Sequence, residues 1–288
     1  MQNIPRSVRA YWELMRLDRP IGTILLLWPT LAALWLSAKG LPPIRVLLAF
    51  VLGVIVMRAC GCVINDIADR KFDPHVKRTQ NRPLADGRLT VIQAWTCFLV
   101  LAFIGVTIVL LFLNTMTWIL ALIGLGITCI YPFLKRVTHL PQLVLGVAFS
   151  WGILMADTAI NNAIGLSTWV FFTMSFVWIV AYDTEYAMVD REDDIKLGLK
   201  SIAILFGKQD RFAIILLELV ALGLLVVLGL TAQLSMMYYV GVGLIGVLFV
   251  YQWILIRNRD PSNCFRACTN NGWVGLVLFL TLVGVHAF

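Results

Sequence analysis

The chain has 288 residues, of which 60% are hydrophobic and only 14% are charged. This composition, with a mean hydropathy of +0.87, excludes an ordinary soluble domain and is typical of a membrane protein. The net charge of +7 would also fit a nucleic-acid-binding protein. However, the positions of the basic residues along the chain explain this charge by membrane topology, and no nucleic-acid partner is expected.

Nine runs of about 20 apolar residues are long enough to cross a bilayer as helices. In chain order they cover residues 20–38, 44–64, 91–113, 115–133, 140–159, 166–187, 211–230, 236–256 and 272–287. The breaks between them contain turn residues such as Pro42, Pro43 and Pro141. The sequence therefore predicts an all-α, polytopic membrane protein, which we expect to be one transmembrane domain over residues 1–288.

Basic residues fall on alternate sides of these nine spans. Twenty of the 23 Lys and Arg residues precede the first span or lie in the loops after the second, fourth, sixth and eighth. The opposite loops contain only Lys39 and Arg45, and Arg58 lies inside the second span. Because loops rich in Lys and Arg stay in the cytoplasm, we expect a cytoplasmic N-terminus. Residues 1–19 are polar and basic and predict no signal peptide.

Acidic residues are concentrated at the cytoplasmic ends of the second and sixth spans. The first cluster contains Asn65, Asp66, Asp69 and Asp73, and the second contains Asp183, Glu185, Asp190, Asp193 and Asp194. Residues four apart share a helix face. The Asp-x-x-x-Asp spacing recurs after 121 residues, from Asp69 to Asp190. We interpret this as a weak parallel internal repeat of four-helix units, with a ninth helix added, that brings the clusters together across a central cavity.

These clusters contain the hard oxygen ligands that Mg²⁺ prefers, and Mg²⁺ is typically held by one or two carboxylates together with phosphate oxygens. The predicted metal ligands are Asn65, Asp66, Asp69, Asp73, Asp190 and Asp194. Neighbouring residues that can bind the substrate are Lys77, Arg78, Arg82, Lys135, Arg136, Asp183, Arg191 and Lys196. The sequence thus predicts a site for a lipid diphosphate at the mouth of an apolar cavity.

Arg58 differs from the loop residues because an arginine inside a span is costly unless it faces a polar cavity or a partner. It precedes Asn65 by seven residues and therefore lies on much the same stripe of the helix. We interpret Arg58 as facing the cavity; a structural salt bridge is the alternative.

Two motifs and four longer stretches resemble a known family. Gly61–Asp73 contains the pattern NxxxDxxxD, and Asp190–Asp194 contains DxxxD. With HVKRTQNRPL (75–84), YPFLKRVTHLPQ (131–142), YDTEYAMVDREDD (182–194) and KSIAILFG (200–207), the chain resembles the UbiA superfamily of intramembrane aromatic prenyltransferases. Within it, these stretches look like the bacterial enzymes that prenylate 4-hydroxybenzoate for ubiquinone synthesis. The resemblance covers essentially the whole chain.

This resemblance implies nine transmembrane helices around a central cavity, in a bacterial inner membrane. The distribution of Lys and Arg predicts that the active site faces the cytoplasm. It implies Mg²⁺ and transfer of a polyprenyl group from a polyprenyl diphosphate to the ring carbon ortho to the phenol of 4-hydroxybenzoate. The catalytic positions that it implies are Asp69, Asp73, Asp190 and Asp194. The acceptor carboxylate needs a cationic partner, for which Arg16, Arg58 and Arg136 are the candidates.

Two other classes of membrane protein also use acidic residues in membrane helices. A cation-coupled transporter places them near the bilayer midplane, whereas these lie at the ends of helices. An alcohol phosphatidyltransferase that forms phospholipids uses Asp-rich helices with a divalent metal, but the Asp-Gly and Ala-Arg pattern of that family is not found here. Prenyl transfer is therefore the preferred interpretation.

Overall fold

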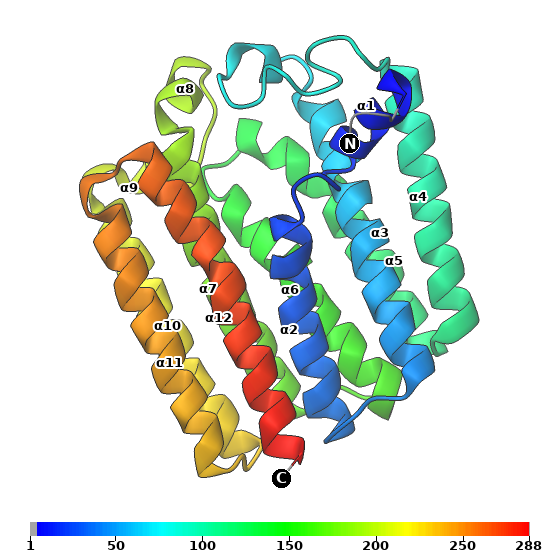
Figure 1. Ribbon diagram of the computed structural model, residues 1–288, viewed down its shortest axis with the longest axis vertical. Helices are drawn as coiled ribbons and strands as arrows, with labels where there is room; N and C mark the ends of the chain where they lie inside the picture. Colours follow the sequence, from blue (N-terminus) through cyan, green and yellow to red (C-terminus); the bar gives the residue numbers. More distant parts are fainter. Residues whose placement is uncertain (1–4, 288) are drawn as a thin grey trace.

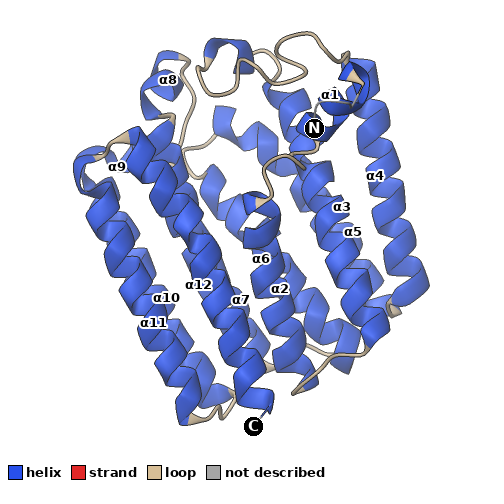
Figure 2. Cartoon of the chain, viewed as in Figure 1, coloured by secondary structure: helices blue, strands red, loops and turns tan. Residues whose placement is uncertain are grey.

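A computed structural model describes residues 5–287, apart from the side chains of Arg6 and Lys135, as a bundle of helices (Figures 1 and 2). The long helices are α2 (Ile21–Ala38), α3 (Ile44–Asp69), α4 (Val91–Phe112), α5 (Thr115–Ile130), α6 (Pro141–Asn161), α7 (Leu166–Val189), α10 (Asp210–Thr231), α11 (Met236–Leu255) and α12 (Pro261–Ala287). The short ones are α1 (Arg6–Leu14), η1 (Asp73–His75), η2 (Tyr131–Arg136), α8 (Arg191–Lys196), α9 (Ile202–Phe206), η3 (Gly207–Gln209) and η4 (Ile256–Asn258). In the described part of the chain, nine helices are long and apolar enough to cross a membrane, which confirms the all-α, nine-span prediction.

Two of the predicted span boundaries were wrong, because polar residues continue the helices. The second span, predicted to end at 64, continues in α3 to Asp69, and the ninth, predicted to begin at 272, begins at Pro261. The start of α12 has a clear local cause: Asp260 accepts a hydrogen bond from the backbone N–H of Asn263 at 3.0 Å, and Pro261 occupies the first helical position. Asn271, which interrupts the apolar run, is fully buried. Hydropathy treated these residues as water-facing, whereas Asp69 and Asn271 face the interior.

The helices pack closely where glycine meets a large side chain. A Cβ atom at Gly275 of α12 would lie 2.9 Å from Trp28 of α2, and one at Gly146 of α6 would lie 2.9 Å from Phe176 of α7. Small residues at such positions let membrane helices approach each other. The largest group of buried apolar residues lies among α2, α6, α7, α10, α11 and α12, with Val46 and Phe50 of α3.

Helices α4 and α5 are the least buried of the spans. In the most apolar stretch of each, 11% of the residues are buried, compared with 50% in α7. α4 packs mainly on α3, and α5 packs mainly on α6. Both helices contribute residues to the lining of the central cavity, such as Val106 and Leu125, whereas Phe103 and Leu111 of α4 are exposed outside it.

Most of the short elements gather at one end of the bundle, opposite the C-terminal end of the chain (Figure 1). There α1 packs its buried face, with Ala10 and Leu14, against Val63 and Ile64 of α3. The loop that follows α3, and α8 after α7, lie at the same end (Figure 1). The two helices that carry the acidic motifs therefore end under one common cover of loops. The internal repeat itself stays a prediction.

Candidate active site

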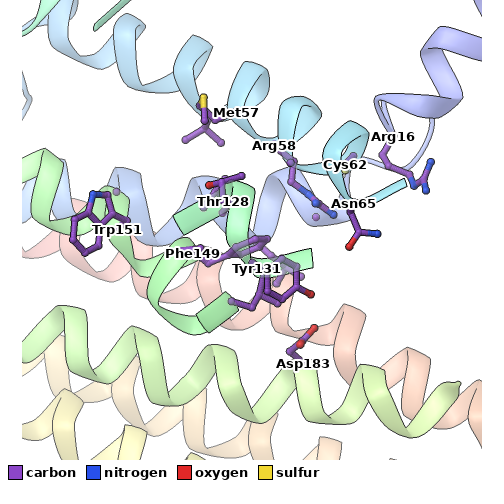
Figure 3. A pocket seen from close by; sticks show the side chains of 18 of the residues that line it. Arg16, Met57, Arg58, Cys62, Asn65, Thr128, Tyr131, Phe149, Trp151 and Asp183 are labelled. Atoms are coloured by element: carbon purple, nitrogen blue, oxygen red, sulfur yellow. The ribbon is translucent and has the colours of Figure 1, made fainter. Parts of the chain in front are cut away.

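A cavity of about 1380 Å³ lies inside the bundle, as predicted. In the described residues, α2 to α7 and α12 line it, whereas α10 and α11 do not. One end is lined by charged residues from both acidic motifs, and the walls and the far end are lined by apolar residues such as Leu113, Trp118 and Met155. Figure 3 shows residues of this cavity from α3, α5, α6 and α7. The cavity thus combines a charged mouth with an apolar depth.

The first acidic motif is buried and is held by arginines from other segments. Asp66 is 1% exposed and accepts hydrogen bonds from Arg16 at 2.8 Å and from Arg82 at 3.1 Å. The same nitrogen of Arg82 lies 2.9 Å from Asp73, which is 5% exposed. Burial and the charges of Asp66 and Asp69 raise the pKa of Asp73, although Arg82 acts against them. Burial acts to lower the pKa of Arg82, but Asp66 and Asp73 outweigh it and the pKa rises. Arg82 is therefore a fixed positive charge between two carboxyl groups.

Asp69 lies between an amide and a third arginine. Asn65 donates to Asp69 at 3.3 Å, one helical turn away on α3. Arg136 of η2 donates to Asp69 at 3.1 Å and to the carbonyl of Ala68 at 2.5 Å. Its guanidinium also lies over the ring of Phe72, 5.0 Å from the centroid. Arg136 thus closes the end of α3 and is already paired with a carboxylate.

The second acidic motif begins with Asp190 at the end of α7. Arg78, from the loop after α3, donates to Asp190 through Nε at 2.9 Å and also through Nη2. The Arg78 guanidinium lies 4.7 Å from the ring centroid of Tyr186, one turn before Asp190. Burial acts to lower the pKa of Arg78, but the charges of Tyr186 and Asp190 outweigh it and the pKa rises. Arg78 therefore links the loop of the first motif to the helix of the second, and both Arg78 and Asp183 line the cavity.

The predicted site residues divide into those that line the cavity and those that do not. Arg191 lines the cavity but donates to Asp210 of α10 at 2.9 Å, and Lys196 lies at the surface, 3.7 Å from Asp193. The backbone N–H of Asp194 donates to the carbonyl of Asp190 at 2.9 Å. The predicted residues that line the cavity are Arg16, Arg58, Asn65, Asp66, Lys77, Arg78, Arg82, Asp183, Asp190 and Arg191. Those outside its lining are Asp69, Asp73, Arg136, Asp194 and Lys196, and the side chain of Lys135 lies outside the described residues.

Arg58 projects from α3 into the cavity, in the region of Tyr131 and Phe149 (Figure 3). Its guanidinium lies 5.7 Å from the centroid of the Phe149 ring. Its Nε is buried without a hydrogen-bond partner, and no carboxylate pairs with it among the residues that the structure describes. The expected cavity-facing arginine is therefore present, without the counter-ion that Arg16, Arg82 and Arg136 each have.

The donor atoms at the mouth suit a hydrated Mg²⁺ ion. Within residues 5–287, no three Asp, Glu, His or Cys side chains come together as a ready-made metal site. Mg²⁺ does not require one, because it keeps several waters and takes one or two carboxylates plus phosphate oxygens. Asn65 and Asp66 of α3 and Asp183 and Asp190 of α7 supply hard oxygens to the same cavity. The residues present therefore fit Mg²⁺ together with a diphosphate.

Two residues of α7 show what helical spacing adds to the motif. Glu185 was grouped with the second cluster, but it lies outside the cavity lining, is fully buried and accepts a hydrogen bond from Asn271 at 3.2 Å. It follows Asp183 by two residues and so points to nearly the opposite side of the helix. Tyr186 was not singled out, yet it lines the cavity and contacts Arg78. It precedes Asp190 by four residues, a spacing that places both on one face.

Comparison with known proteins agrees with this architecture. The model of the UbiA prenyltransferase family matches residues 26–283. The chain is 54% identical over 279 residues to a 4-hydroxybenzoate octaprenyltransferase of Tolumonas auensis, covering 97% of both chains. It is 53% identical over 273 residues to one of Escherichia fergusonii, covering 95% of this chain and 94% of that one.

Solved structures share the fold at lower identity. The apo structure of a UbiA homolog from Aeropyrum pernix K1 matches with a TM-score of 0.81 and 23% identity, over 91% of this chain and 97% of that one. A UbiA homolog from Archaeoglobus fulgidus bound to GPP and Mg²⁺ matches with a TM-score of 0.75 and 18% identity, over 97% of this chain and 100% of that one. With its nine spans, its charged cavity mouth and a family match over most of its length, the chain belongs to the UbiA prenyltransferase family.

Proposed function

We propose that this protein is a Mg²⁺-dependent 4-hydroxybenzoate polyprenyltransferase of ubiquinone biosynthesis, acting as one transmembrane domain over residues 1–288. It transfers a polyprenyl group from a polyprenyl diphosphate to the ring carbon ortho to the phenol and releases diphosphate. The observation that carries the proposal is the similarity to 4-hydroxybenzoate octaprenyltransferases, at 54% identity over 97% of both chains. The cavity supports it, because a charged mouth above an apolar depth suits a lipid diphosphate.

The diphosphate of the donor binds at the charged mouth. Arg78, Arg82 and Lys77 line this region and donate to phosphate oxygens. Four residues face the same space and would hold Mg²⁺, namely Asn65, Asp66, Asp183 and Asp190. The other predicted catalytic positions of the two motifs are Asp69, Asp73 and Asp194. When bound, Mg²⁺ supplies Lewis-acid stabilisation of the negative charge on the leaving group.

The prenyl tail occupies the apolar depth of the cavity, beside residues such as Leu113 and Met155. As the allylic C–O bond breaks, Arg78 and Arg82 stabilise the charge that develops on the diphosphate. The allylic carbon then bonds to the ring carbon, and a base takes the ring proton. The apolar walls exclude water, which would otherwise convert the allylic cation into an alcohol.

Arg58 is the preferred partner of the acceptor carboxylate. A carboxylate cannot enter an apolar cavity unpaired without a large desolvation cost. Arg16 and Arg136 are already paired with Asp66 and Asp69, whereas Arg58 faces the cavity without a counter-ion among the described residues. Its position one to two turns deeper than Asn65 leaves the mouth to the diphosphate. This geometry favours Arg58 over Arg136, whose role in binding the acceptor stays a prediction.

One assay tests the proposal. Purified protein is incubated with Mg²⁺, 4-hydroxybenzoate and a series of prenyl diphosphates, and the products are identified by mass. We expect 4-hydroxybenzoate that carries one prenyl group, together with an equal amount of diphosphate. Release of diphosphate with no prenylated ring would contradict the acceptor, and no reaction with any donor would contradict prenyl transfer itself.

The orientation in the membrane is part of the proposal. The distribution of Lys and Arg supports a cytoplasmic N-terminus and a cytoplasmic active site in the inner membrane of a bacterium. Reporter fusions at Arg82 and Lys200 should give the cytoplasmic signal, and fusions at Asn161 and Ser235 should give the external one. The opposite pattern at either loop of the first pair would place the site on the wrong side.

A further inference from the structure

Gly22, in the first turn of α2, lies directly against the guanidinium of Arg58 on α3. A Cβ atom built on Gly22 would lie 2.6 Å from Nε and 2.8 Å from Cζ of Arg58, and closer still to Nη2. Contacts below 3.0 Å are essentially never made by real Cβ atoms. Both residues line the central cavity. The arginine thus uses the space that a side chain at position 22 would fill.

The backbone does not explain a glycine at this position. Gly22 lies within the helix α2 and does not have the left-handed conformation that favours glycine. In a helix, glycine is less favourable than alanine by about 0.5–1 kcal/mol. The glycine at position 22 is therefore explained by the space beside its Cα atom, which the guanidinium of Arg58 occupies.

Among the described residues, packing and a ring contact hold Arg58 in place, and no ion pair does. Arg16 and Arg82 are held in place by carboxylates at 2.8–3.1 Å. The guanidinium of Arg58 has no such partner among the described residues; it lies between Gly22 on α2 and the ring of Phe149 on α6. A single added methyl group on the α2 side would therefore displace it with no ion pair to resist the movement.

We propose that Gly22 is a positioning residue that seats Arg58 so that its guanidinium faces the bound acceptor. This inference rests on the proposed role of Arg58 as the partner of the acceptor carboxylate. Relief of the overlap requires Arg58 to move by about 1 Å, a misplacement that can cost about a hundredfold in activity. The loss is expected in acceptor binding, because the diphosphate is held by other residues at the mouth.

The test compares Gly22→Ala with two helical Gly→Ala variants that lie outside the cavity lining. Gly22→Ala should raise the KM for 4-hydroxybenzoate about tenfold or more, with the KM for the prenyl diphosphate within about twofold of the wild type. Gly126→Ala in α5 is the open control, because its Cβ would meet nothing within 4 Å. Gly229→Ala in α10 is the crowded control, because its Cβ would lie 2.8 Å from the ring of Tyr238. Both controls should keep an acceptor KM close to that of the wild type.

A double-mutant cycle then asks whether Gly22 acts through Arg58. In an Arg58→Ala background the overlap is gone, so Gly22→Ala should have no further effect on the acceptor KM. The double variant should also fold as Arg58→Ala does, which thermal unfolding in detergent measures even if Gly22→Ala alone folds poorly. An effect of Gly22→Ala that persists in the Arg58→Ala background would overturn the inference.

The single variants separate the inference from the proposal beneath it. A raised acceptor KM in Arg58→Ala with an unchanged one in Gly22→Ala overturns the role of Gly22 and leaves that of Arg58 intact. An unchanged acceptor KM in Arg58→Ala overturns the role of Arg58 and the inference with it. An equal rise in the two KM values of Gly22→Ala shows general damage to the site and also overturns the inference.

Discussion

At the end of α3, Asp66, Asp69 and Asp73 are 1%, 7% and 5% exposed, and arginines from three other segments donate to them. At the end of α7, Asp190 and Asp194 have the same spacing but are only half-buried. The neighbouring Arg191, Lys196 and Arg259 form their ion pairs outside the motif or at its surface. Arg78 donates to Asp190, so both motifs are counter-charged. The same sequence spacing therefore gives two ion-paired motifs that differ in burial, with the α3 motif buried and the α7 motif partly open to solvent.

The largest expected effect comes from removing one carboxylate from either side. Asp69→Asn and Asp190→Asn keep the volume of the side chain but lose its charge, and each should lower turnover about a hundredfold or more. The measurement is the rate of prenylated product formation, with thermal unfolding as the control for folding. An Asp190→Asn enzyme with a near-normal rate would restrict the essential metal site to the α3 side.

Metal removal tests both sides at once. EDTA should abolish turnover of the wild-type enzyme, and added Mg²⁺ should restore it, because a carboxylate repels a diphosphate unless a cation lies between them. If the α7 side holds its ligands more loosely, Asp190→Asn should need more Mg²⁺ for half-maximal activity than Asp69→Asn does. Full activity in EDTA would contradict a divalent metal on either side.

Arg82 and Arg78 test the comparison of the two motifs through the free energy of unfolding. Arg82→Ala leaves Asp73 buried without its ion pair, so we expect a loss of about 3–5 kcal/mol in the free energy of unfolding. Arg78→Ala removes the partner of Asp190, which is only half-buried, so the loss in the free energy of unfolding should be smaller. The KM for the prenyl diphosphate should rise, because Arg78 is proposed to bind it. Chemical denaturation in mild detergent, followed by circular dichroism, measures the first effect. Equal losses in the two variants would contradict an effect of this difference in burial.

The smallest expected effect lies at the outer rim, where Glu13 joins α1 to the loop before α4. Glu13 accepts hydrogen bonds from Arg9 at 2.9 Å and from Arg88 at 2.5 Å. Burial acts to raise the pKa of Glu13, but the bonds from Arg88 and Arg9 outweigh it and the pKa falls below its usual value. The stabilisation is therefore present above that usual value and is lost as the pH falls through the lowered one.

Because this pair is exposed, Glu13→Gln should cost about 0.2–1 kcal/mol at neutral pH. Melting temperatures of the wild type and the variant, measured from neutral to acid pH, should converge at low pH. A difference that stays constant with pH would mean that packing, and not charge, joins α1 to the loop.

Much of this architecture follows from hydropathy, because each span must bury its backbone in lipid as a helix. Hydropathy failed where polar residues face inward, as at Asp69 and Asn271, and it did not detect the short, charged helix α1. The motif residues were found by their spacing, and Arg58 by its cost inside a span. The ion pairs were not predictable: Arg78 and Asp190 are 112 residues apart, and only the folded chain selects that pairing among many basic neighbours.

The part of the cavity lined by α4 and α5 has a consequence for the thermal stability of the enzyme. Val106 and Val109 of α4 and Leu122 and Leu125 of α5 line the cavity, so a prenyl tail bound there buries more of their apolar surface. A prenyl tail binds only the folded protein, so its binding free energy adds to the free energy of unfolding. We therefore expect the melting temperature to rise with the length of the bound prenyl diphosphate, because a longer tail buries more apolar surface in the cavity.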